Sequence, residues 1–318
     1  MKISFIGASG FVGTRILDLY DNNNVNLKNI DIAQSQTHAN ITEIGDVLDT
    51  ESLSKTLENS DCVVLLAAQH RDDVSPISLY YDVNVSGLKN VLSVMEKVNC
   101  KRLLFFSSVA IYGLDKDCPD ENFIPDPFNH YGKSKWEAEQ VLQCWYKTHP
   151  NWNINIIRPS VIFGEHNRGN VYNLLKQIVS GRFLMIGKGT NKKSMAYVGN
   201  VAAFAKYLID NYTEGYNVFN YTDKPDFSVN TLVQSVYEVL EKTPPKTRIP
   251  YFVGILGGYC FDMLACILRK KLSISSIRIK KFCAETSINA TKAHSSGFKA
   301  PFDLKEGLSK TIRSEFMN

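Results

Sequence analysis

Two residues in the stretch YGKSK, Tyr131 and Lys135, have the types and the spacing for acid–base chemistry. Side chains four positions apart on a helix share one face. An ammonium beside a phenol favours the phenolate, so we expect Lys135 to lower the pKa of Tyr131 toward neutrality. A tyrosine–lysine pair at this spacing is common by chance, so the prediction depends on its surroundings.

Two further polar side chains complete the predicted catalytic set. Ser108, in FFSSVAIYG, ends a predicted strand at the carboxyl edge of a sheet, where open α/β sheets bind ligands. Its hydroxyl could bridge a substrate oxygen and Tyr131. Asn84, in YYDVNVSG, is predicted to order a helix or a water near Lys135.

The stretch GASGFVG, residues 7–13, carries three glycines between a predicted strand and a predicted helix. This context is typical of dinucleotide binding. Gly7 permits a tight turn, Gly10 lets the backbone approach a pyrophosphate, and the helix start offers free N–H groups to it. The GxxGxxG spacing, rather than GxGxxG, points to the short-chain dehydrogenase variant of the loop.

Asp31 ends the second predicted strand, where a carboxylate would accept hydrogen bonds from the adenosine ribose. It would repel a 2′-phosphate, which favours NAD over NADP. No metal site is predicted. The predicted cofactor-binding residues are Gly7, Ser9, Gly10, Phe11, Val12, Gly13, Asp31, Asp46, Val47, Ala67, Ala68, Tyr131, Lys135, Pro159 and Val161.

Short apolar runs alternate with helical patterns over the first half of the chain. The predicted strands are 3–7, 26–31, 41–45, 62–67, 103–107 and 154–158, and the predicted helices are 11–21, 50–58, 78–98 and 131–148. This alternation predicts an α/β fold, a Rossmann-like doubly wound parallel sheet. We expect residues 1–165 to form the NAD-binding domain, with 192–224 returning to it. Residues 166–191 and 225–318 would form a smaller, interleaved substrate-binding region.

Composition and charge limit the range of partners. The 318 residues carry a formal charge of +4, but residues 241–299 hold eleven basic and only three acidic residues. That part is therefore expected to meet something anionic. The start of the chain lacks the pattern of a signal peptide, and the seven cysteines form no CxxC pair, which favours a reduced compartment. No nucleic-acid partner is expected.

Residues 251–268 form an apolar run that is long enough to suggest a membrane-spanning helix. Asp262 and three glycines interrupt it, and a central Asp costs about 2.5–3.5 kcal/mol on insertion. We therefore expect the segment 251–281 to lie at or dip into a membrane surface, with basic side chains on anionic head groups. A core helix and a dimer face are the alternatives. The flanking basic residues are Arg269, Lys270, Lys271, Arg278, Lys280 and Lys281.

The motifs GASGFVG, LLAAQHRDDV, SSVAIYG, YGKSK and RPSVIFGE occur in order over residues 1–165. With them the chain resembles the extended short-chain dehydrogenase/reductase family, the sugar-nucleotide epimerases and dehydratases. The resemblance implies bound NAD(H), Tyr131 as the acid/base, Ser108 assisting it, and Lys135 on the cofactor ribose. It also implies a homodimer formed through the helices 78–98 and 131–148.

The resemblance narrows the reaction. Family 4,6-dehydratases carry an Asp-Glu pair where this chain has Val109 and Ala110, and bifunctional epimerase-reductases use an additional Cys and His. Neither reading suits this chain, because Val109 and Ala110 are apolar and no cysteine follows Ser108 directly. Reversible oxidation at C4 of a sugar, followed by return of the hydride to the other face, is the expected epimerisation. A 4-ketoreductase is the alternative.

Substrate contacts are also implied by the resemblance. Lys193, before the pattern xxxYV, stands where family members hold the substrate diphosphate. From their position alone, after the fourth predicted strand at the ligand edge of the sheet, Asp72 or Asp73 would contact sugar hydroxyls or pair with Arg71. Other residues expected to grip the diphosphate or uridine are Arg168, Asn170 and Asn173, with Arg278 as a second diphosphate ligand.

A closer resemblance runs through the whole chain. Stretches such as NRGNVYNLLKQI, KSMAYVGN, LGGYCFD and KKFCAETSINATKAHSSGF are similar to the N-acetylglucosaminyl-diphospho-undecaprenol 4-epimerases of bacterial O-antigen and surface-polysaccharide assembly. The resemblance implies interconversion of GlcNAc and GalNAc on undecaprenyl diphosphate. The enzyme would be peripheral, at the cytoplasmic face of the inner membrane. A soluble UDP-GlcNAc 4-epimerase is the alternative.

Overall fold

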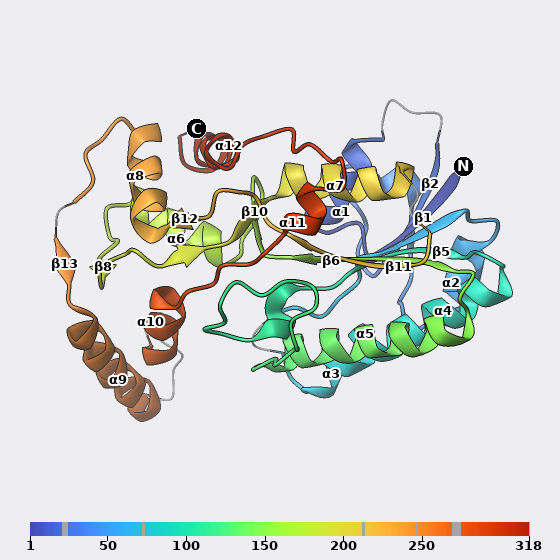
Figure 1. The fold of residues 1–318 in the computed structure, drawn as a ribbon, viewed down its shortest axis with the longest axis horizontal. Coiled ribbons are helices and arrows are strands. Elements are labelled where there is room, and N and C mark those ends of the chain that lie inside the picture. The colour runs from blue at the N-terminus through green and yellow to red at the C-terminus, as the bar shows by residue number, and fades with distance from the viewer. Residues whose placement is uncertain (21–24, 72–73, 212–213, 246, 269–274, 318) are drawn as a thin grey trace.

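A seven-stranded parallel sheet with helices on both faces forms most of the molecule, and a smaller region is attached at one end (Figure 1). The structure is a computed structural model, and it describes residues 1–20, 25–71, 74–211, 214–245, 247–268 and 275–317. The predicted α/β class and doubly wound parallel sheet are confirmed.

The strand order β11-β6-β5-β4-β1-β2-β3 reverses direction between β1 and β4. In open α/β sheets, ligands bind outside the carboxyl ends of the strands at such a switch point. The central strands are apolar and buried on both faces, as parallel strands covered by helices are. The strands are β1 (Lys2–Ile6), β2 (Asn26–Asp31), β3 (Thr42–Ile44), β4 (Cys62–Leu65), β5 (Arg102–Phe106), β6 (Asn153–Pro159) and β11 (Tyr216–Tyr221).

Helices cover the two faces of this sheet in separate layers (Figure 1). One layer is α1 (Phe11–Asp18) and α7 (Val198–Asp210), which bury their apolar side chains in one core with β1 and β4. The other layer contains α2 (Thr50–Leu57), α4 (Gly87–Lys97) and α5 (His130–Thr148), which form a second core. A short helix, α11 (Thr291–His294), packs beside β11.

Two predicted elements differ in detail. The helix expected over 78–98 consists of α3 (Ser78–Tyr81), a π-helical turn (Asp82–Ser86) and α4. π-Turns inside helices are frequent at functional sites, and this one contains Asn84. The strand expected over 41–45 is shortened to β3, because the 3₁₀ turn Ala39–Ile41 precedes it.

The smaller region has its own apolar core between three helices and, among the described residues, three pairs of short strands. The division of the chain into domains stays a prediction, although β11 does add the seventh strand of the main sheet after the chain has left it. The C-terminal helix α12 was not expected from the sequence. The elements are β7 (Val161–Phe163), α6 (Asn170–Val179), β8 (Met185–Ile186), β9 (Lys192–Lys193), β10 (Met195–Tyr197), β12 (Phe227–Ser228), α8 (Val229–Val239), β13 (Arg248–Ile249) and α12 (Leu304–Phe316).

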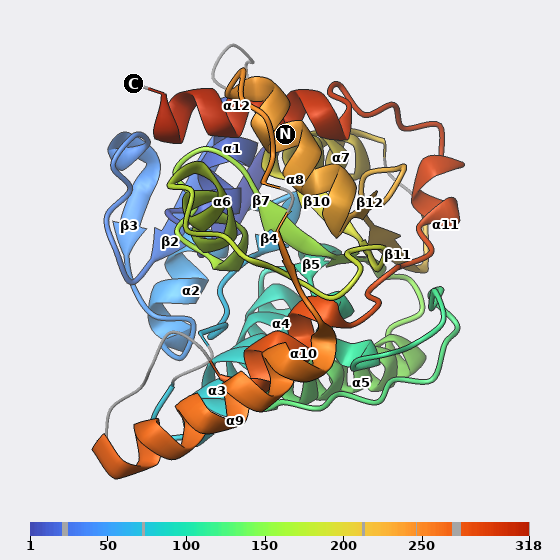
Figure 2. The ribbon, with the colours of Figure 1, turned by 90° about the vertical axis from the view of Figure 1, so that its left-hand side faces the viewer.

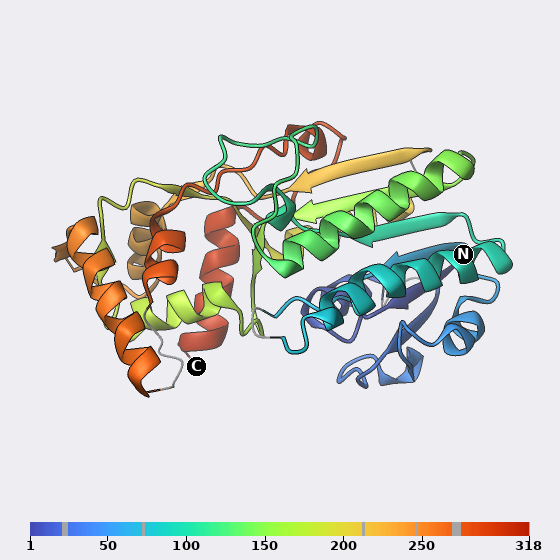
Figure 3. The same ribbon diagram turned by 90° about the horizontal axis from the view of Figure 1, so that it is seen from below.

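The apolar run forms the helix α9 (Tyr251–Leu268), which packs against α10 (Ser276–Cys283) at the edge of the molecule (Figures 2 and 3). A Cβ on Gly258 would lie 2.8 Å from the Cα of Ser276, so only glycine permits this approach. Asp262 accepts a hydrogen bond of 3.1 Å from the Ser276 N–H. Gly254, Gly258 and Asp262 therefore face the protein, whereas a Cβ on Gly257 would meet nothing within 4 Å. Arg269, Lys270 and Lys271 lie outside the described residues.

Among the residues that the structure describes, α9 is the one helix whose length and composition would suffice to cross a membrane. Only 11% of it is buried. Its side chains therefore do not form a core, which excludes one of the alternatives that the sequence left open.

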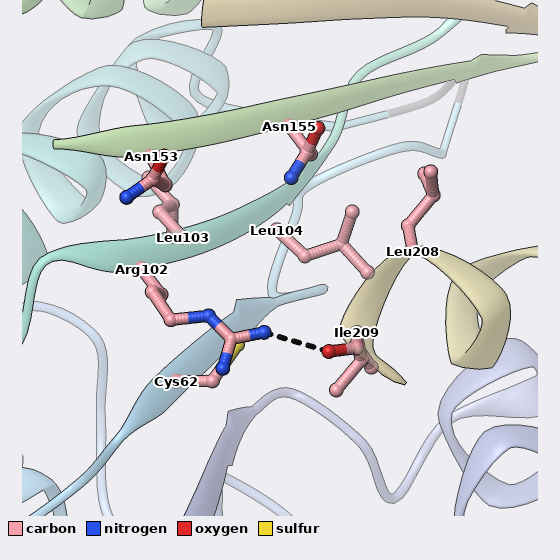
Figure 4. A pocket seen from close by; sticks show the side chains of 8 residues that line it. All are labelled: Cys62, Arg102, Leu103, Leu104, Asn153, Asn155, Leu208 and Ile209. Carbon is pink, nitrogen blue, oxygen red and sulfur yellow. Dashed lines mark hydrogen bonds between the residues drawn. The ribbon is translucent and has the colours of Figure 1, made fainter. Parts of the chain in front are cut away.

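A small cavity lies at the amino ends of β4, β5 and β6, opposite the edge that carries the glycine loop (Figure 4). Arg102 crosses it and donates a hydrogen bond of 2.6 Å to the carbonyl of Ile209 at the end of α7. A cation at a helix C-terminus satisfies free carbonyls and favours the helix dipole. This cavity therefore belongs to the joint between sheet and helix.

A buried ion pair joins α5 to β6. Arg158 donates to Glu139 at 2.5 and 3.0 Å, and the two side chains are 4% and 0% exposed. Ser107, at the end of β5, donates to the same carboxylate at 2.5 Å. Two strands and one helix are thus held together by one carboxylate, one turn after Lys135.

Replacing Glu139 by Gln should destabilise the fold strongly. The variant leaves the Arg158 guanidinium buried without its counter-charge, and breaking such a pair costs about 3–5 kcal/mol. Urea denaturation followed by circular dichroism measures the loss. Glu137→Gln, at an exposed position of the same helix, is the control and should stay within about 0.5 kcal/mol of the parent. Equal stability of the two variants would contradict the role of the pair.

Candidate active site

The glycine loop lies at the switch point, between β1 and α1. Gly7 has φ +87°, and a Cβ on it would lie 2.4 Å from the backbone N of Ala67. A Cβ on Gly13 would lie 2.3 Å from the Cα of Ala8. A Cβ on Gly10 would meet only the Gly7 carbonyl, at 3.9 Å. The first and third glycines therefore close the loop, while the second leaves open space at the start of α1.

Two side chains of β2 hold the loop in place. Asp31 accepts hydrogen bonds from the N–H groups of Ser9, at 2.9 Å, and Ala33, at 3.1 Å. Asn29 accepts one from the Ala8 N–H at 3.0 Å. A carboxylate has further lone pairs, so Asp31 can hold the loop and still accept a hydrogen bond from the adenosine ribose. That predicted role stays a prediction. Asn29 was missed; a polar residue among the apolar positions of a buried strand is the signal that could have found it.

The remaining predicted cofactor residues lie at the same edge of the sheet. Ala67 follows β4 and donates to the Ile6 carbonyl at 2.8 Å, and Val47 is buried against Gly87. Between the predicted residues Pro159 and Val161, the buried hydroxyl of Ser160 has no hydrogen-bond partner within the described chain. An orphaned buried hydroxyl there suits a ligand with polar groups. Ala68, Phe11, Val12 and Asp46 flank this edge, in the loops after β3 and β4 and at the start of α1.

Tyr131 and Lys135 lie in the first turns of α5, which Asn129 caps by accepting the Gly132 N–H at 2.8 Å. The Ser108 hydroxyl is hydrogen-bonded to the Tyr131 oxygen. The Lys135 ammonium is buried, donates to the Phe106 carbonyl at 2.7 Å and lies 4.8 Å from the centre of the Phe105 ring. The structure thus brings together the serine, tyrosine and lysine that the spacing predicted.

The expected effect of Lys135 on Tyr131 is wrong for the protein as described. Burial raises the pKa of Tyr131, and the hydrogen bond from Ser108 is the group that lowers it. Burial lowers the pKa of Lys135 to about 7, against the charge of Glu139, which raises it. The ammonium is bonded to the Phe106 carbonyl, and desolvation outweighs attraction when charged groups leave water.

Asn84 holds α5, the helix of Tyr131 and Lys135, in position. Its carbonyl oxygen accepts the Gln69 N–H at 2.8 Å, and its amide donates to Gln69 O at 3.1 Å and to the Ser134 hydroxyl at 2.8 Å. Ser134 in turn donates to the Tyr131 carbonyl at 3.0 Å. Asn84 therefore ties the loop after β4 to α5, which makes it a positioning residue, in line with the expectation that it orders a helix.

The predicted substrate residues fall into two groups. Lys193, in β9, donates to the carbonyls of Lys281, at 2.9 Å, and Ala284, at 2.6 Å, and burial lowers its pKa to about 8. Arg278 is exposed on α10, the helix that contains Lys281.

The second group lies at the start of α6. Arg168 pairs with Glu315 of α12 at 2.6 Å and lies 4.5 Å from the Tyr172 ring centre, while Asn170 and Asn173 are exposed. Glu315 was missed, because nothing near it in the sequence signals a partner 147 residues away. Asp72 and Asp73 lie outside the described residues.

Two alanine substitutions separate the roles of the glycines. Gly13→Ala should destabilise the protein by about 1–3 kcal/mol, because the new methyl meets backbone that cannot move aside. Gly10→Ala has room, so it should keep its stability and retain less dinucleotide. Urea denaturation and the nucleotide content of the purified proteins measure the two effects. A Gly10→Ala protein with full nucleotide content would argue against a pyrophosphate at this turn.

Comparison with known proteins agrees with this geometry. The NAD dependent epimerase/dehydratase family matches residues 3–221. An N-acetyl-alpha-D-glucosaminyl-diphospho-ditrans,octacis-undecaprenol 4-epimerase of Escherichia coli O157:H7 is 57% identical over 318 residues, covering 100% of this chain and 96% of the relative. A UDP-glucose 4-epimerase of Vibrio cholerae is 27% identical and covers 98% of this chain and 95% of its own length.

Solved structures share the fold. MoeE5 in complex with UDP-glucose and NAD has a TM-score of 0.76 at 20% identity, covering 99% of this chain and 98% of that one. The UDP-glucuronic acid 4-epimerase from Bacillus cereus in complex with NAD has a TM-score of 0.77 at 19% identity, with the same coverage. From the glycine loop, the Ser108–Tyr131–Lys135 arrangement and these matches, the chain belongs to the NAD-dependent epimerase/dehydratase family.

Proposed function

We propose that this protein is an NAD-dependent C4 epimerase that interconverts GlcNAc and GalNAc on undecaprenyl diphosphate, for O-antigen and surface-polysaccharide synthesis. The observation that carries the proposal is the 57% identity to the undecaprenol-linked 4-epimerase, which extends over the full chain and includes the α9–α10 hairpin. The Ser108–Tyr131–Lys135 arrangement supports the chemistry.

The residues present fit NAD. The open space over Gly10 and the start of α1 suit a pyrophosphate, Asp31 suits the adenosine ribose, and the orphaned Ser160 hydroxyl offers a polar group at the edge of the sheet. Bound there, NAD supplies a hydride acceptor and donor. Lys135 would hold the nicotinamide ribose, as the family resemblance implies.

The chain's own residues handle the proton. Ser108 would orient the 4-hydroxyl of the sugar and share a hydrogen bond with Tyr131, whose oxygen takes the hydroxyl proton and later returns it. The raised pKa of Tyr131 means that the phenol is protonated in the protein alone. Positive charge close to the phenol must therefore lower its pKa before it can act as a base.

The residues after Ser108 limit the reaction to one proton site. Val109 and Ala110 lie in a 3₁₀ turn, Val109–Tyr112, and Val109 packs against a small apolar cluster of Ile111, Tyr112 and Ile288. A second acid–base group is absent from these two positions, so elimination across C5 and C6 has no catalyst there. Reversible oxidation at a single carbon is the chemistry that one tyrosine supports.

A side-by-side assay tests the proposal. The purified protein receives GlcNAc-diphospho-undecaprenol in detergent or UDP-GlcNAc in the same buffer, without added reduced cofactor. We expect the lipid-linked sugar to be epimerised and UDP-GlcNAc to be left unchanged. Conversion of UDP-GlcNAc alone would instead identify a soluble UDP-sugar epimerase. Tyr131→Phe should lower turnover by at least about 100-fold while the nucleotide content stays the same.

We also propose that the protein binds peripherally to the cytoplasmic face of the inner membrane through α9. Large exposed apolar patches such as the surface of α9 mark interaction sites. Asp262, Gly254 and Gly258 fix α9 on the protein, which favours a helix lying on the membrane over one crossing it. The exposed apolar side chains include Phe252 (69%), Leu256 (64%), Met263 (62%) and Ile267 (71%).

Vesicle flotation tests this surface. Replacing both Leu256 and Ile267 by Ser should reduce binding to vesicles that contain anionic lipid by at least about tenfold, because each large apolar side chain contributes about 1.5–3 kcal/mol when buried. The control replaces Ile32 and Ile44, which are 75% and 61% exposed on the nucleotide-binding side. Unchanged flotation of the Leu256/Ile267 variant would rule α9 out as the membrane contact.

The homodimer through α4 and α5 stays a proposal as well. The two helices lie side by side on one face of the sheet (Figure 3). Their outward positions include Lys89, Lys133 and Glu137, so a dimer formed there would have a polar rim.

A further inference from the structure

We propose that a cavity of about 470 Å³ between the 186–191 turn and α10 holds the first isoprene units next to the diphosphate and leads the lipid chain onto α9. This inference rests on the proposed function, whose substrate it makes specific. The cavity is lined by Asp115, Ile186, Gly187, Lys188, Gly189, Thr190, Asn191, Tyr251, Lys280, Cys283 and Ala284.

The cavity adjoins the lysine that is expected to hold the diphosphate. The Lys193 ammonium donates to the carbonyl of Ala284 at 2.6 Å, and Ala284 is part of the cavity wall. Across the cavity, the Cys283 thiol donates to the Ile186 carbonyl at 3.7 Å, which joins α10 to the turn. A diphosphate bound at Lys193 would therefore have the phosphate that carries the lipid chain next to this cavity.

The lining suits an anion with an apolar tail. Lys188 and Lys280 provide two cations against the single carboxylate of Asp115, while Ile186 and Tyr251 provide apolar surface. The volume lies within the range of about 300–1,000 Å³ for small-molecule sites, so it takes more than a phosphate group.

Asn191 is the carboxamide in the described cavity wall, and its NH2 group contacts the protein's own backbone. The Asn191 amide donates to the carbonyls of Phe282, at 2.9 Å, and Ala284, at 3.1 Å. A nucleoside needs side chains that read its donors and acceptors, and it ends where its base ends. An isoprenoid needs only apolar contact and an open end of the cavity through which the rest of the lipid chain continues.

The way out is the helix α9. Tyr251 is both a wall of the cavity and the first residue of α9, and Gly254, one turn later, packs on Ile186. Lys280 lies 5.5 Å from the ring centre of Tyr259, on the second turn after that. The cavity wall thus continues into the exposed apolar surface on which a polyprenyl chain would lie.

Competition on the NAD-loaded enzyme tests the cavity. Farnesyl diphosphate, inorganic pyrophosphate and UDP are each used to inhibit epimerisation, at one detergent concentration. In the parent protein we expect farnesyl diphosphate to inhibit at least about tenfold better than pyrophosphate, because its isoprenoid is buried.

Thr190→Trp narrows the cavity from its exposed rim. It should bring the two inhibition constants to within about twofold of each other by weakening farnesyl diphosphate alone. Thr243→Trp, at an exposed position away from the cavity, should match the parent.

Several results would overturn the inference. The melting temperature of Thr190→Trp separates a loss of binding from a loss of stability. Lys280→Glu, with Lys242→Glu as its control, repeats the test from the charged side. If Thr190→Trp weakens inhibition by farnesyl diphosphate and by pyrophosphate equally, the cavity does not hold an isoprenoid. The same conclusion follows if UDP is the best inhibitor of the parent protein and loses most of its inhibition in Thr190→Trp. A wrong proposed function gives a different result: the parent protein would then leave GlcNAc-diphospho-undecaprenol unconverted, before any inhibitor is added.

Discussion

The hydrogen bond from the buried Lys135 ammonium to the Phe106 carbonyl is the contact on which the site depends. It joins the first turns of α5 to the end of β5. Ser108 lies two residues beyond Phe106, and Tyr131 lies one helical turn before Lys135. One bond between a side chain and the backbone therefore sets the distance between the two hydroxyls that share the proton. Asn84 and the Glu139–Arg158 pair hold the same helix from its other sides.

Burial determines the protonation of this site. It raises the pKa of Tyr131 and lowers that of Lys135 to about 7. The charge of Glu139, itself paired with Arg158, limits the fall of the lysine pKa. A ligand that brings charge into such a desolvated site has a large effect on both groups, because electrostatic interactions are strong where water is excluded. In the proposed mechanism, chemistry at Tyr131 is therefore coupled to occupation of the nucleotide-binding edge.

The α9–α10 hairpin connects Lys193 to an exposed apolar surface. Gly258 allows the two helices to approach, and Asp262 caps α10. The hairpin also places the carbonyls of Lys281 and Ala284 on the Lys193 ammonium. The proposed diphosphate site at Lys193, the cavity and the exposed apolar helix thus follow one another, which suits a substrate with a charged head and a long apolar chain.

Sequence alone determined the features that depend on neighbouring residues. The alternation of strands and helices, the glycine loop and the four-residue spacing of Tyr131 and Lys135 are local, because backbone geometry fixes them within a few turns. Only the tertiary structure decided the partner of Lys135, the direction of the Tyr131 pKa shift, the pairing of Arg168 with Glu315, and the use of Asp262 as a helix cap. These depend on burial and on contacts between segments far apart in the chain, and neither can be read from spacing. Gly254, Gly258 and Asp262, which interrupt the apolar run in the sequence, are the residues through which α9 approaches the protein most closely.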